Sequence, residues 1–334
     1  MDTAQRLRAQ LERRVRDATP TLAAEILRAW DRLAAELSEA KLARIIASGN
    51  AEQVFAELLT PELLDRVFGE VRRAMFAQTT ESMAFHAKQL GKGVGIGFGV
   101  LSPEVIEGIR KIDVKMADSL KDDVRDLVRA YVENGIRDGV NPRTTARAIR
   151  AGVGLTDKQL AWVDNFRAEL EAGKRSALNR ALGRGVFTKP DGSLGFKPGH
   201  AGGVGIGKRD MELMRRTLGT DARLTTPQIN RLVGQYQKRL TAWHSETLAR
   251  TAALDAQKAG QHFATKQAIA DGILDAERMV SEWLHVGDSR VREEHDFHEV
   301  VPFDTPFRTG EVIPGESTYN CRCIKRDYQE RAKP

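Results

Sequence analysis

Apolar residues recur every three or four positions over residues 1–75, which is the period of one face of an α-helix. Leu22, Ile26 and Trp30 are typical of this pattern. Proline and glycine interrupt it, and proline is accepted at the first position of a helix but seldom in its interior. We therefore predict a bundle of short helices over residues 1–90, with breaks at Thr19-Pro20, Gly49-Asn50 and Thr60-Pro61.

Residues 91–182 form a second predicted helical region, built around one long helix. The alternating glycines from Gly91 to Val100 indicate a linker or a tightly packed crossing. Ser102 and Pro103 then suit the start of a helix whose apolar stripe needs a partner helix. The stripe consists of Val105, Ile109, Ile112, Met116, Leu120, Val124, Leu127 and Tyr131.

Shorter helices follow this long one. The pair Asn141-Pro142 is typical of a helix start. Thr156 and Gln159 have the spacing of a capping box, in which each side chain accepts a hydrogen bond from the other residue's backbone amide. We expect the helix that begins there to end near Gly173.

The remaining chain divides into a loop and a C-terminal module. Residues 183–224 begin with a stretch rich in glycine and proline, which predicts an extended loop or a small hairpin insertion up to Gly207. Residues 225–334 begin with a predicted helix from Thr226 to about Gly260 and a second from Phe263 to Ile273. Apolar residues then alternate with polar and turn residues, as in short strands. These residues are Val280, Trp283, Val286, Val291, Val300, Val301, Phe303, Phe307, Val312 and Ile313.

Together these patterns predict a mainly α protein, an elongated helical bundle, with a small C-terminal α+β module of short strands. No apolar run reaches the roughly 18 residues that a membrane-spanning helix needs, and residues 1–16 are charged rather than apolar. We therefore expect a soluble protein that is made in the cytoplasm. The chain has 52 Lys and Arg against 46 Asp and Glu, a net charge of +6, which is compatible with work near DNA but does not require it.

The C-terminal module concentrates residues that bind metals. Three of the seven histidines, His285, His295 and His298, lie within 40 residues of the only two cysteines, Cys321 and Cys323. Thiolate and imidazole are the usual ligands of zinc, which takes four in a tetrahedron. Asp288 or His285, with His295 or His298, could join the cysteines in a structural zinc site, and we take His295, Cys321, Cys323 and Asp288 as the candidate ligands. The C-x-C spacing is a poor one for a disulfide between the two.

Two other interpretations of this module stay open. In the first, the cysteines are small buried residues, and Asp288, Arg290 and His295 form a hydrogen-bonded brace across a hairpin. In the second, a cysteine thiolate acts as a nucleophile with His295 as its base, which would make the protein a metal- or cysteine-dependent enzyme of nuclease or peptidase type. The sequence contains no acidic cluster of the kind that a two-metal nuclease needs, so we favour a protein that is not an enzyme.

The loop region carries weak signals for phosphate binding. Gly202 to Lys208 match the first seven positions of a P-loop, but Arg209 stands where a Ser or Thr must bind magnesium. An irregular loop is the better interpretation. Any contact with DNA would be non-specific and would come from basic residues, because aromatic residues for base stacking are sparse. The candidates are Lys189, Lys197, Lys208 and Arg209.

Several motifs in order resemble the phage Mu F-like family of minor head proteins, also called phage head morphogenesis proteins. The resemblance covers about two thirds of the chain and begins with Val153-Gly154-Leu155-Thr156 and, on a later helix, Arg250-Thr251. Its most specific stretch is a Trp, then Asp-x-Arg-x-Arg-x-x-His, then Asn-Cys-Arg-Cys. The matching residues are Trp283, Asp288, Arg290, Arg292, His295, Asn320, Cys321, Arg322 and Cys323. Glu299 stands where the family often has a glycine.

The resemblance implies a structural component of a tailed double-stranded DNA phage or prophage. Such a protein would be made in the host cytoplasm and would lie in the virion, inside the capsid near the portal. Its expected partners are the portal protein, the major capsid protein and packaged double-stranded DNA, and no membrane. No cofactor follows from the resemblance; a structural zinc ion is the one cofactor that the cysteines and histidines of the C-terminal module allow.

Overall fold

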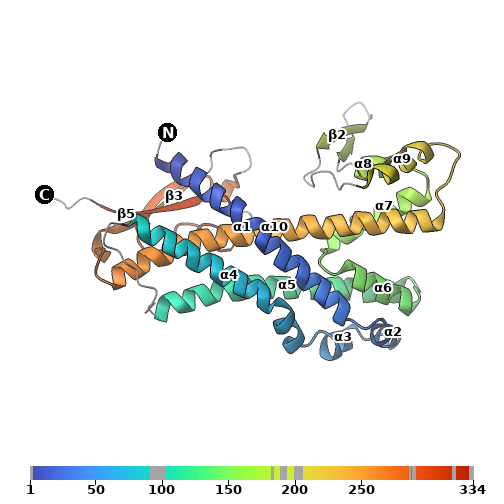
Figure 1. Cartoon of the computed structure of the whole chain (residues 1–334), viewed down its shortest axis with the longest axis horizontal. Coiled ribbons are helices and arrows are strands. Elements are labelled where there is room, and N and C mark those ends of the chain that lie inside the picture. The colour runs from blue at the N-terminus through green and yellow to red at the C-terminus, as the bar shows by residue number, and fades with distance from the viewer. Residues whose placement is uncertain are drawn as a thin grey trace. The chain divides into compact units, whose positions relative to one another are not determined.

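A computed structural model describes residues 3–90, 103–181, 184–188, 194–198, 206–285, 287, 291–317 and 321–330. The fold is mainly helical, with a small antiparallel sheet near the C-terminus, as the sequence predicts (Figure 1). The α-helices are α1 (Thr3–Glu36), α2 (Glu39–Ala47), α3 (Ala51–Glu57), α4 (Pro61–Gln89), α5 (Pro103–Arg137), α6 (Pro142–Gly152), α7 (Asp157–Glu171), α8 (Ser176–Ala181), α9 (Lys208–Thr217) and α10 (Thr226–Ala270). The strands are β1 (Arg184–Thr188), β2 (Leu194–Pro198), β3 (Met279–Leu284), β4 (His298–Pro302) and β5 (Ile324–Gln329).

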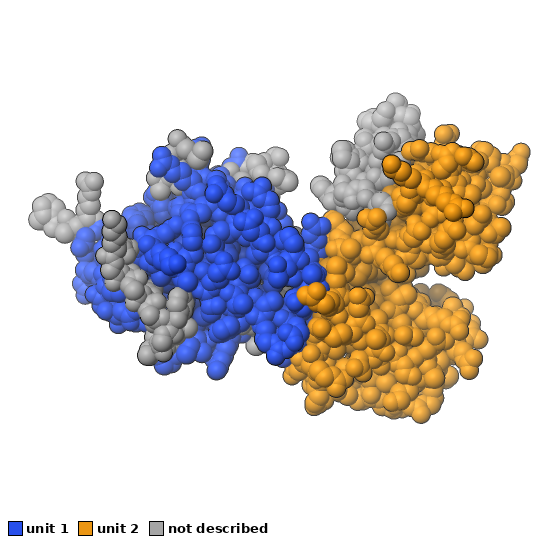
Figure 2. All heavy atoms as spheres, viewed as in Figure 1, with its two compact units in different colours: residues 1–26, 68–119, 246–334 blue, residues 27–67, 120–245 orange. Residues whose placement is uncertain are grey.

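The chain divides into two compact units, each built from segments that are far apart in the sequence (Figure 2). Unit 1 consists of residues 1–26, 68–119 and 246–334. Unit 2 consists of residues 27–67 and 120–245. The division falls inside the long helices α1, α4, α5 and α10.

The expected break at Thr19-Pro20 is wrong, because α1 continues through Pro20. Proline removes one helical N–H and leaves the carbonyl four residues earlier without its usual donor. Pro20 lies on the exposed side of α1, so water can reach that carbonyl. The Thr19 hydroxyl donates to the Val15 carbonyl at 2.6 Å, one turn earlier on the same helix. The other two breaks are confirmed, with Asn50 capping α3 and Pro61 opening α4.

The expected division near Gly260 is also wrong, since α10 is continuous from Thr226 to Ala270. Gly260 serves a close helix contact in unit 1. A Cβ atom at Gly260 would lie 2.5 Å from the Ser82 Cβ of α4. The Ser82 hydroxyl donates to the Gln257 carbonyl at 3.0 Å. Glycine here allows the two backbones to approach, so it marks packing rather than a helix end.

The helical core of unit 1 joins α4, α5 and α10 through small and apolar side chains. Its members are Met83, Ala87, Val105, Ile109, Ala259, Phe263 and Ala264. Val105 and Ile109 belong to the apolar stripe that the sequence predicts for the long helix, and Leu120, Val124 and Leu127 are buried in unit 2. The described part of this stripe therefore finds its partner helices within the chain itself.

The C-terminal sheet of unit 1 has the antiparallel strand order β4-β3-β5. Leu284 at the end of β3 lies opposite His298 at the start of β4 and Ile324 at the start of β5. The sequence pattern predicts β3 and β4 but misses β5. Val312 and Ile313, which the pattern assigns to a strand, lie instead in a bend of the segment between β4 and β5. The segment of β5, IKRDYQ, is too polar to show the alternation of a half-buried strand.

The packing of unit 2 explains the Val153-Gly154-Leu155-Thr156 segment. Thr156 caps α7, and the capping box with Gln159 is confirmed. Gly154 has a φ of +85° and lies directly against the buried Trp30 ring. The Nδ1 atom of His244 lies 2.9 Å from the Gly154 carbonyl oxygen, and burial lowers the pKa of this imidazole. The insertion before α9 contains the antiparallel pair β1 and β2, a small hairpin as expected.

Gly154→Ala is expected to destabilise unit 2. The left-handed backbone costs an L-residue about 1–2 kcal/mol. A Cβ at this position would also lie 2.8 Å from two Trp30 atoms, and overpacking of this kind costs about 1–3 kcal/mol. Gly139→Ala is the matched control, because Gly139 has a φ of +63° and none of the described atoms comes within 4 Å of the place that its Cβ would take. Urea unfolding followed by circular dichroism should show the larger loss for Gly154→Ala, and equal losses would contradict the role of Trp30.

Across the described residues, no helix combines the length and the hydropathy that crossing a bilayer would require.

Candidate metal centre

His295, Cys321 and Cys323 meet at one end of the C-terminal sheet. His295 ends a short 3-10 helix (Glu293–His295) just before β4, and the cysteines directly precede β5. Because both segments enter the sheet opposite Leu284, the register brings them together. In extended chain, residues two apart share one face, which places both cysteine side chains on the same side.

The distances suit a tetrahedral metal. The Cys321 Sγ lies 3.4 Å and the Cys323 Sγ 3.8 Å from the His295 Nδ1. All three ligand atoms lie within 4.8 Å of one another. With zinc–sulfur and zinc–nitrogen bonds of about 2.3 and 2.0–2.1 Å, a tetrahedral site separates nitrogen and sulfur by about 3.6 Å. These residues form a group that could bind a metal.

Aromatic side chains enclose this group. Trp283 is fully buried, and its ring meets the His295 ring edge-on at 5.2 Å and stacks on Phe297 at 4.9 Å. The Trp283 Nε1 donates to the His295 carbonyl at 3.3 Å. Phe307 closes the cluster from a third side, with ring centroids 5.3 Å from Trp283. These contacts fix the position of His295 from its backbone and from its ring.

The electrostatics of the cysteine pair favour a thiolate. A hydrogen bond from Cys323 lowers the pKa of the Cys321 thiol to about 5, against the opposing effect of burial, with help from Lys258 and His295. The same bond and burial raise the pKa of Cys323. One of the two sulfurs is therefore ready to bind a cation, and metal binding would displace the proton from the other.

Two buried charged residues, Lys258 and Glu311, hold the segments around the cysteines. Lys258 of α10 donates to the Pro314 carbonyl at 2.8 Å and to the Cys321 carbonyl at 2.6 Å. The Glu311 carboxylate accepts hydrogen bonds from the Gly315 and Ser317 amides at 2.9 and 2.8 Å. Although burial opposes it, these bonds and the Ser317 hydroxyl hold the pKa of Glu311 below its usual value. Neither residue belongs to a motif that the sequence singled out.

The other two candidate histidines of the module lie outside the cluster. His298 Nε2 lies 2.6 Å from Glu282 Oε1, and Glu282 is also paired with Arg326 of β5. His285 Nδ1 lies 3.2 Å from Asp296 Oδ1. The expectation that His285 or His298 could join the cysteines is wrong for this arrangement, because His298 is paired with Glu282 and His285 with Asp296, whereas the Nδ1 of His295 lies within 4.8 Å of both sulfurs.

Several predicted site residues lie elsewhere. Asp288, Arg290, Asn320 and Lys189 are outside the described residues, so the proposed polar brace stays a prediction. Arg292 precedes the 3-10 helix and is exposed, whereas Arg322, between the cysteines, is partly buried. On α10, Arg250 is exposed and Thr251 is buried, with its hydroxyl 3.2 Å from the Thr247 carbonyl. Lys208 and Arg209 are exposed in the first turn of α9, and only the backbone is described at Lys197 in β2.

No family model, curated protein or solved structure matches this chain.

Proposed function

We propose that this chain is a minor head protein of a tailed double-stranded DNA phage, associated with the portal inside the capsid. The observation that carries the proposal is the convergence of four residues of the Mu F-like resemblance, Trp283, His295, Cys321 and Cys323, on one buried cluster. Residues that are separated by up to 40 positions in the sequence thus act as one structural unit. This favours a motif that maintains a fold over a chance match.

We propose zinc as the metal of this unit. Two thiolates and an imidazole are ligands that zinc prefers, and the donor set excludes magnesium and calcium, which bind oxygen. The described residues supply three ligands, and Asp288, which lies outside them, is our candidate for the fourth. The metal would fasten the segment before β4 to the segment before β5 and so hold the small sheet together.

Burial favours a structural role over catalysis. His295, Cys321 and Cys323 are only 3–4% exposed, and their immediate neighbours are the rings of Trp283, Phe297 and Phe307. A nucleophile must reach its substrate, and a catalytic zinc keeps one position open to water or substrate. The alternative of an enzyme carried in the virion would need the cluster to open.

We place the partner surface outside the apolar stripe of α5, since the described residues of this stripe, Val105, Ile109, Leu120, Val124 and Leu127, pack within the chain. The expected partners are the portal protein, the major capsid protein and, non-specifically, packaged DNA. Exposed Lys208 and Arg209 are the described residues that would contact phosphates. Such contact would weaken steeply as salt concentration rises, because it releases counterions.

Co-purification tests the proposal. The untagged chain is mixed at micromolar concentration with the portal and major capsid proteins of the phage or prophage that encodes it, and each mixture is analysed by gel filtration with multi-angle light scattering. We expect a stable complex with portal and its presence in procapsids assembled in the host cytoplasm. A portal from an unrelated phage serves as the control. If neither cognate protein is bound, the proposed function is wrong.

A further inference from the structure

The face of α10 that meets the C-terminal sheet is polar. Five residues at helical spacing form this polar stripe, whereas a helix usually packs on a sheet with apolar residues. The polar stripe consists of Lys258, Gln261, His262, Thr265 and Lys266. Lys258, His262 and Thr265 are only 2–4% exposed. All of these residues and the sheet belong to unit 1.

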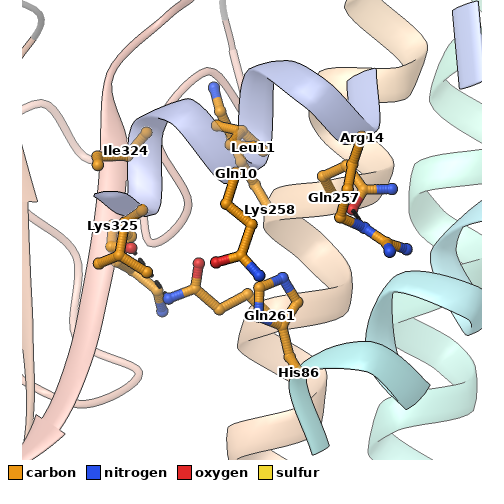
Figure 3. A pocket seen from close by; sticks show the side chains of 10 residues that line it. Gln10, Leu11, Arg14, His86, Gln257, Lys258, Gln261, Ile324 and Lys325 are labelled. Carbon is orange, nitrogen blue, oxygen red and sulfur yellow. Dashed lines mark hydrogen bonds between the residues drawn. The ribbon is translucent and has the colours of Figure 1, made fainter. Parts of the chain in front are cut away.

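Hydrogen bonds connect the polar stripe to β5. The Gln261 amide donates to the Lys325 carbonyl at 3.0 Å, in a small pocket lined by α1, α4, α10 and β5 (Figure 3). Thr265 Oγ1 lies 3.5 Å from Asp327 Oδ2, and the Ser281 hydroxyl of β3 donates to Asp327 Oδ1 at 2.7 Å. Since these bonds can be exchanged for bonds to water, the contact gains specificity but little net stability from them.

His262 is the centre of this contact. Its Nδ1 lies 2.7 Å from the Lys325 Nζ, and its Nε2 lies 3.2 Å from Asp304 Oδ1 in the turn after β4. The Phe303 ring stacks on it at 5.0 Å. The ion pair with Asp327 at 3.2 Å favours the ammonium form of Lys325, which has only protons to donate. Beside this ammonium the Nδ1 accepts, so the ring is neutral, with its proton on Nε2 facing Asp304.

The surrounding charges oppose a second proton on this ring. A proton on Nδ1 would face the Lys325 ammonium, which Asp327 Oδ1 pairs at 3.2 Å, both side chains being 2% exposed. Asp304 is itself paired with Lys266 at 2.7 Å. Burial lowers the pKa of Lys325, and the carboxylates of Asp327, Asp304 and Glu316 oppose this. Burial also lowers the pKa of His86 of α4, and Asp327 acts to raise it. The contact between α10 and the sheet, called the docked state below, therefore requires a neutral His262 ring.

We propose that the contact between the polar stripe of α10 and the C-terminal sheet is an acid-sensitive latch, which opens when His262 takes up a proton. Release would detach β5 and the turn after β4 from α10 while the helical core of unit 1 stays packed. That core is made of apolar and small side chains of α4, α5 and α10, and His262 is not a member of it.

The direction of the pH effect follows from the environment of His262. Burial, and then the Lys325 charge, lower the pKa of His262 below its usual 6.5, although Asp304 and Asp327 act in the opposite sense. The undocked state therefore binds the proton more tightly. Docking is fully present above about pH 6.5 and weakens as the pH falls below it, by at most about tenfold per pH unit for one proton.

Hydrogen exchange on the full chain tests this latch. Amide exchange in β5 is measured between pH 7.5 and 5.5, corrected for intrinsic rates, both with bound metal and after chelation. We expect the opening constant of β5 to rise about tenfold between pH 7.5 and 5.5, with about fivefold of this rise falling between pH 6.5 and 5.5, as one proton allows. In His262→Gln, whose amide can donate to Asp304 and accept from Lys325, the constant should stay flat.

The controls separate this latch from other acid effects. His86→Gln removes a half-buried histidine of α4, one whose pKa is lowered to about 4, and should behave as the unmodified chain does. Acid release of metal through His295 would affect His262→Gln and the unmodified chain equally. If both show the same pH dependence, the proposal is overturned. Should His262→Gln fail to fold, an NMR titration of the unmodified chain decides: His262 and the β5 amides must titrate together, and separate transitions would refute the latch.

Discussion

His295→Ala is expected to abolish metal binding by the full chain. The substitution removes the imidazole nitrogen that lies 3.4 and 3.8 Å from the two cysteine sulfurs. Substitutions around a metal that leave its ligands in place cost about 10–100-fold in affinity, so loss of a ligand should cost more than about 100-fold. Zinc content measured by elemental analysis should fall from about one per chain to nearly none. The β3 and β5 amides should at the same time lose protection from exchange, because metal binding contributes directly to folding.

His298→Ala is the matched control for this substitution. It removes a histidine of the same module, three residues away, whose ring binds Glu282 rather than the cysteines. This variant should keep its zinc. Cys321→Ser should behave like His295→Ala, since it removes a ligand on the other segment. If His295→Ala and Cys321→Ser bind zinc as tightly as the unmodified chain does, the cluster is not a metal site.

The contrast between these two histidines shows where sequence reasoning stops. Sequence spacing put His285, His295 and His298 on equal terms, since each is close enough to the cysteines along the chain. Contacts in the folded chain decide between them, since His298 pairs with Glu282, His285 pairs with Asp296, and His295 lies beside the two sulfurs. The place of the cysteines also depends on β5, whose polar sequence carries no strand signal. Local periodicity could not separate the three histidines, because the selecting contacts are made between distant segments. His295 entered the candidate ligand set as the histidine of the Mu F-like motif.

Helix starts, in contrast, could be predicted from local capping residues in the sequence. Asn141 with Pro142 and Thr156 with Gln159 start helices at the expected residues, because those hydrogen bonds involve only near neighbours. The helix breaks predicted at Pro20 and near Gly260 are wrong because they depend on contacts beyond near neighbours. Solvent exposure permits Pro20 inside α1, and close packing on Ser82 requires Gly260 inside α10. Both residues act through their surroundings in three dimensions, which the sequence alone does not state.

The polar stripe of α10 could have been recognised. Lys258, Gln261, His262 and Thr265 follow the same spacing as an apolar stripe, and such a set on a long helix is usually taken for the solvated face. The neighbouring residues of α10 include many alanines, such as Ala249, Ala252, Ala256 and Ala259, all of which are buried. They leave few large apolar side chains by which the sequence could mark a buried face. A helix rich in alanine can be buried on several sides, so polarity alone does not indicate exposure.

Trp283→Ala is expected to cause the largest loss of stability in the C-terminal module. Trp283 is 0% exposed and touches His295, Phe297 and Phe307 through its ring. Truncation of a buried tryptophan to alanine costs about 3–5 kcal/mol, since it leaves a cavity as well as removing contacts. Trp283→Phe keeps most of the stacking and loses the hydrogen bond to the His295 carbonyl, which is worth about 1 kcal/mol.

Hydrogen exchange resolves this effect by region, which a single unfolding curve does not do for a chain with two compact units. In Trp283→Ala, protection should fall in β3, β4 and β5 and stay unchanged in α6 and α7 of unit 2. Trp162→Ala provides the matched control, because that ring is partly exposed and lies in unit 2, 6.5 Å from Trp243. It should lower protection in unit 2 by a smaller amount and leave the sheet intact. A Trp283→Ala protein with full protection in β5 would show that the aromatic cluster does not hold the metal-binding end of the sheet.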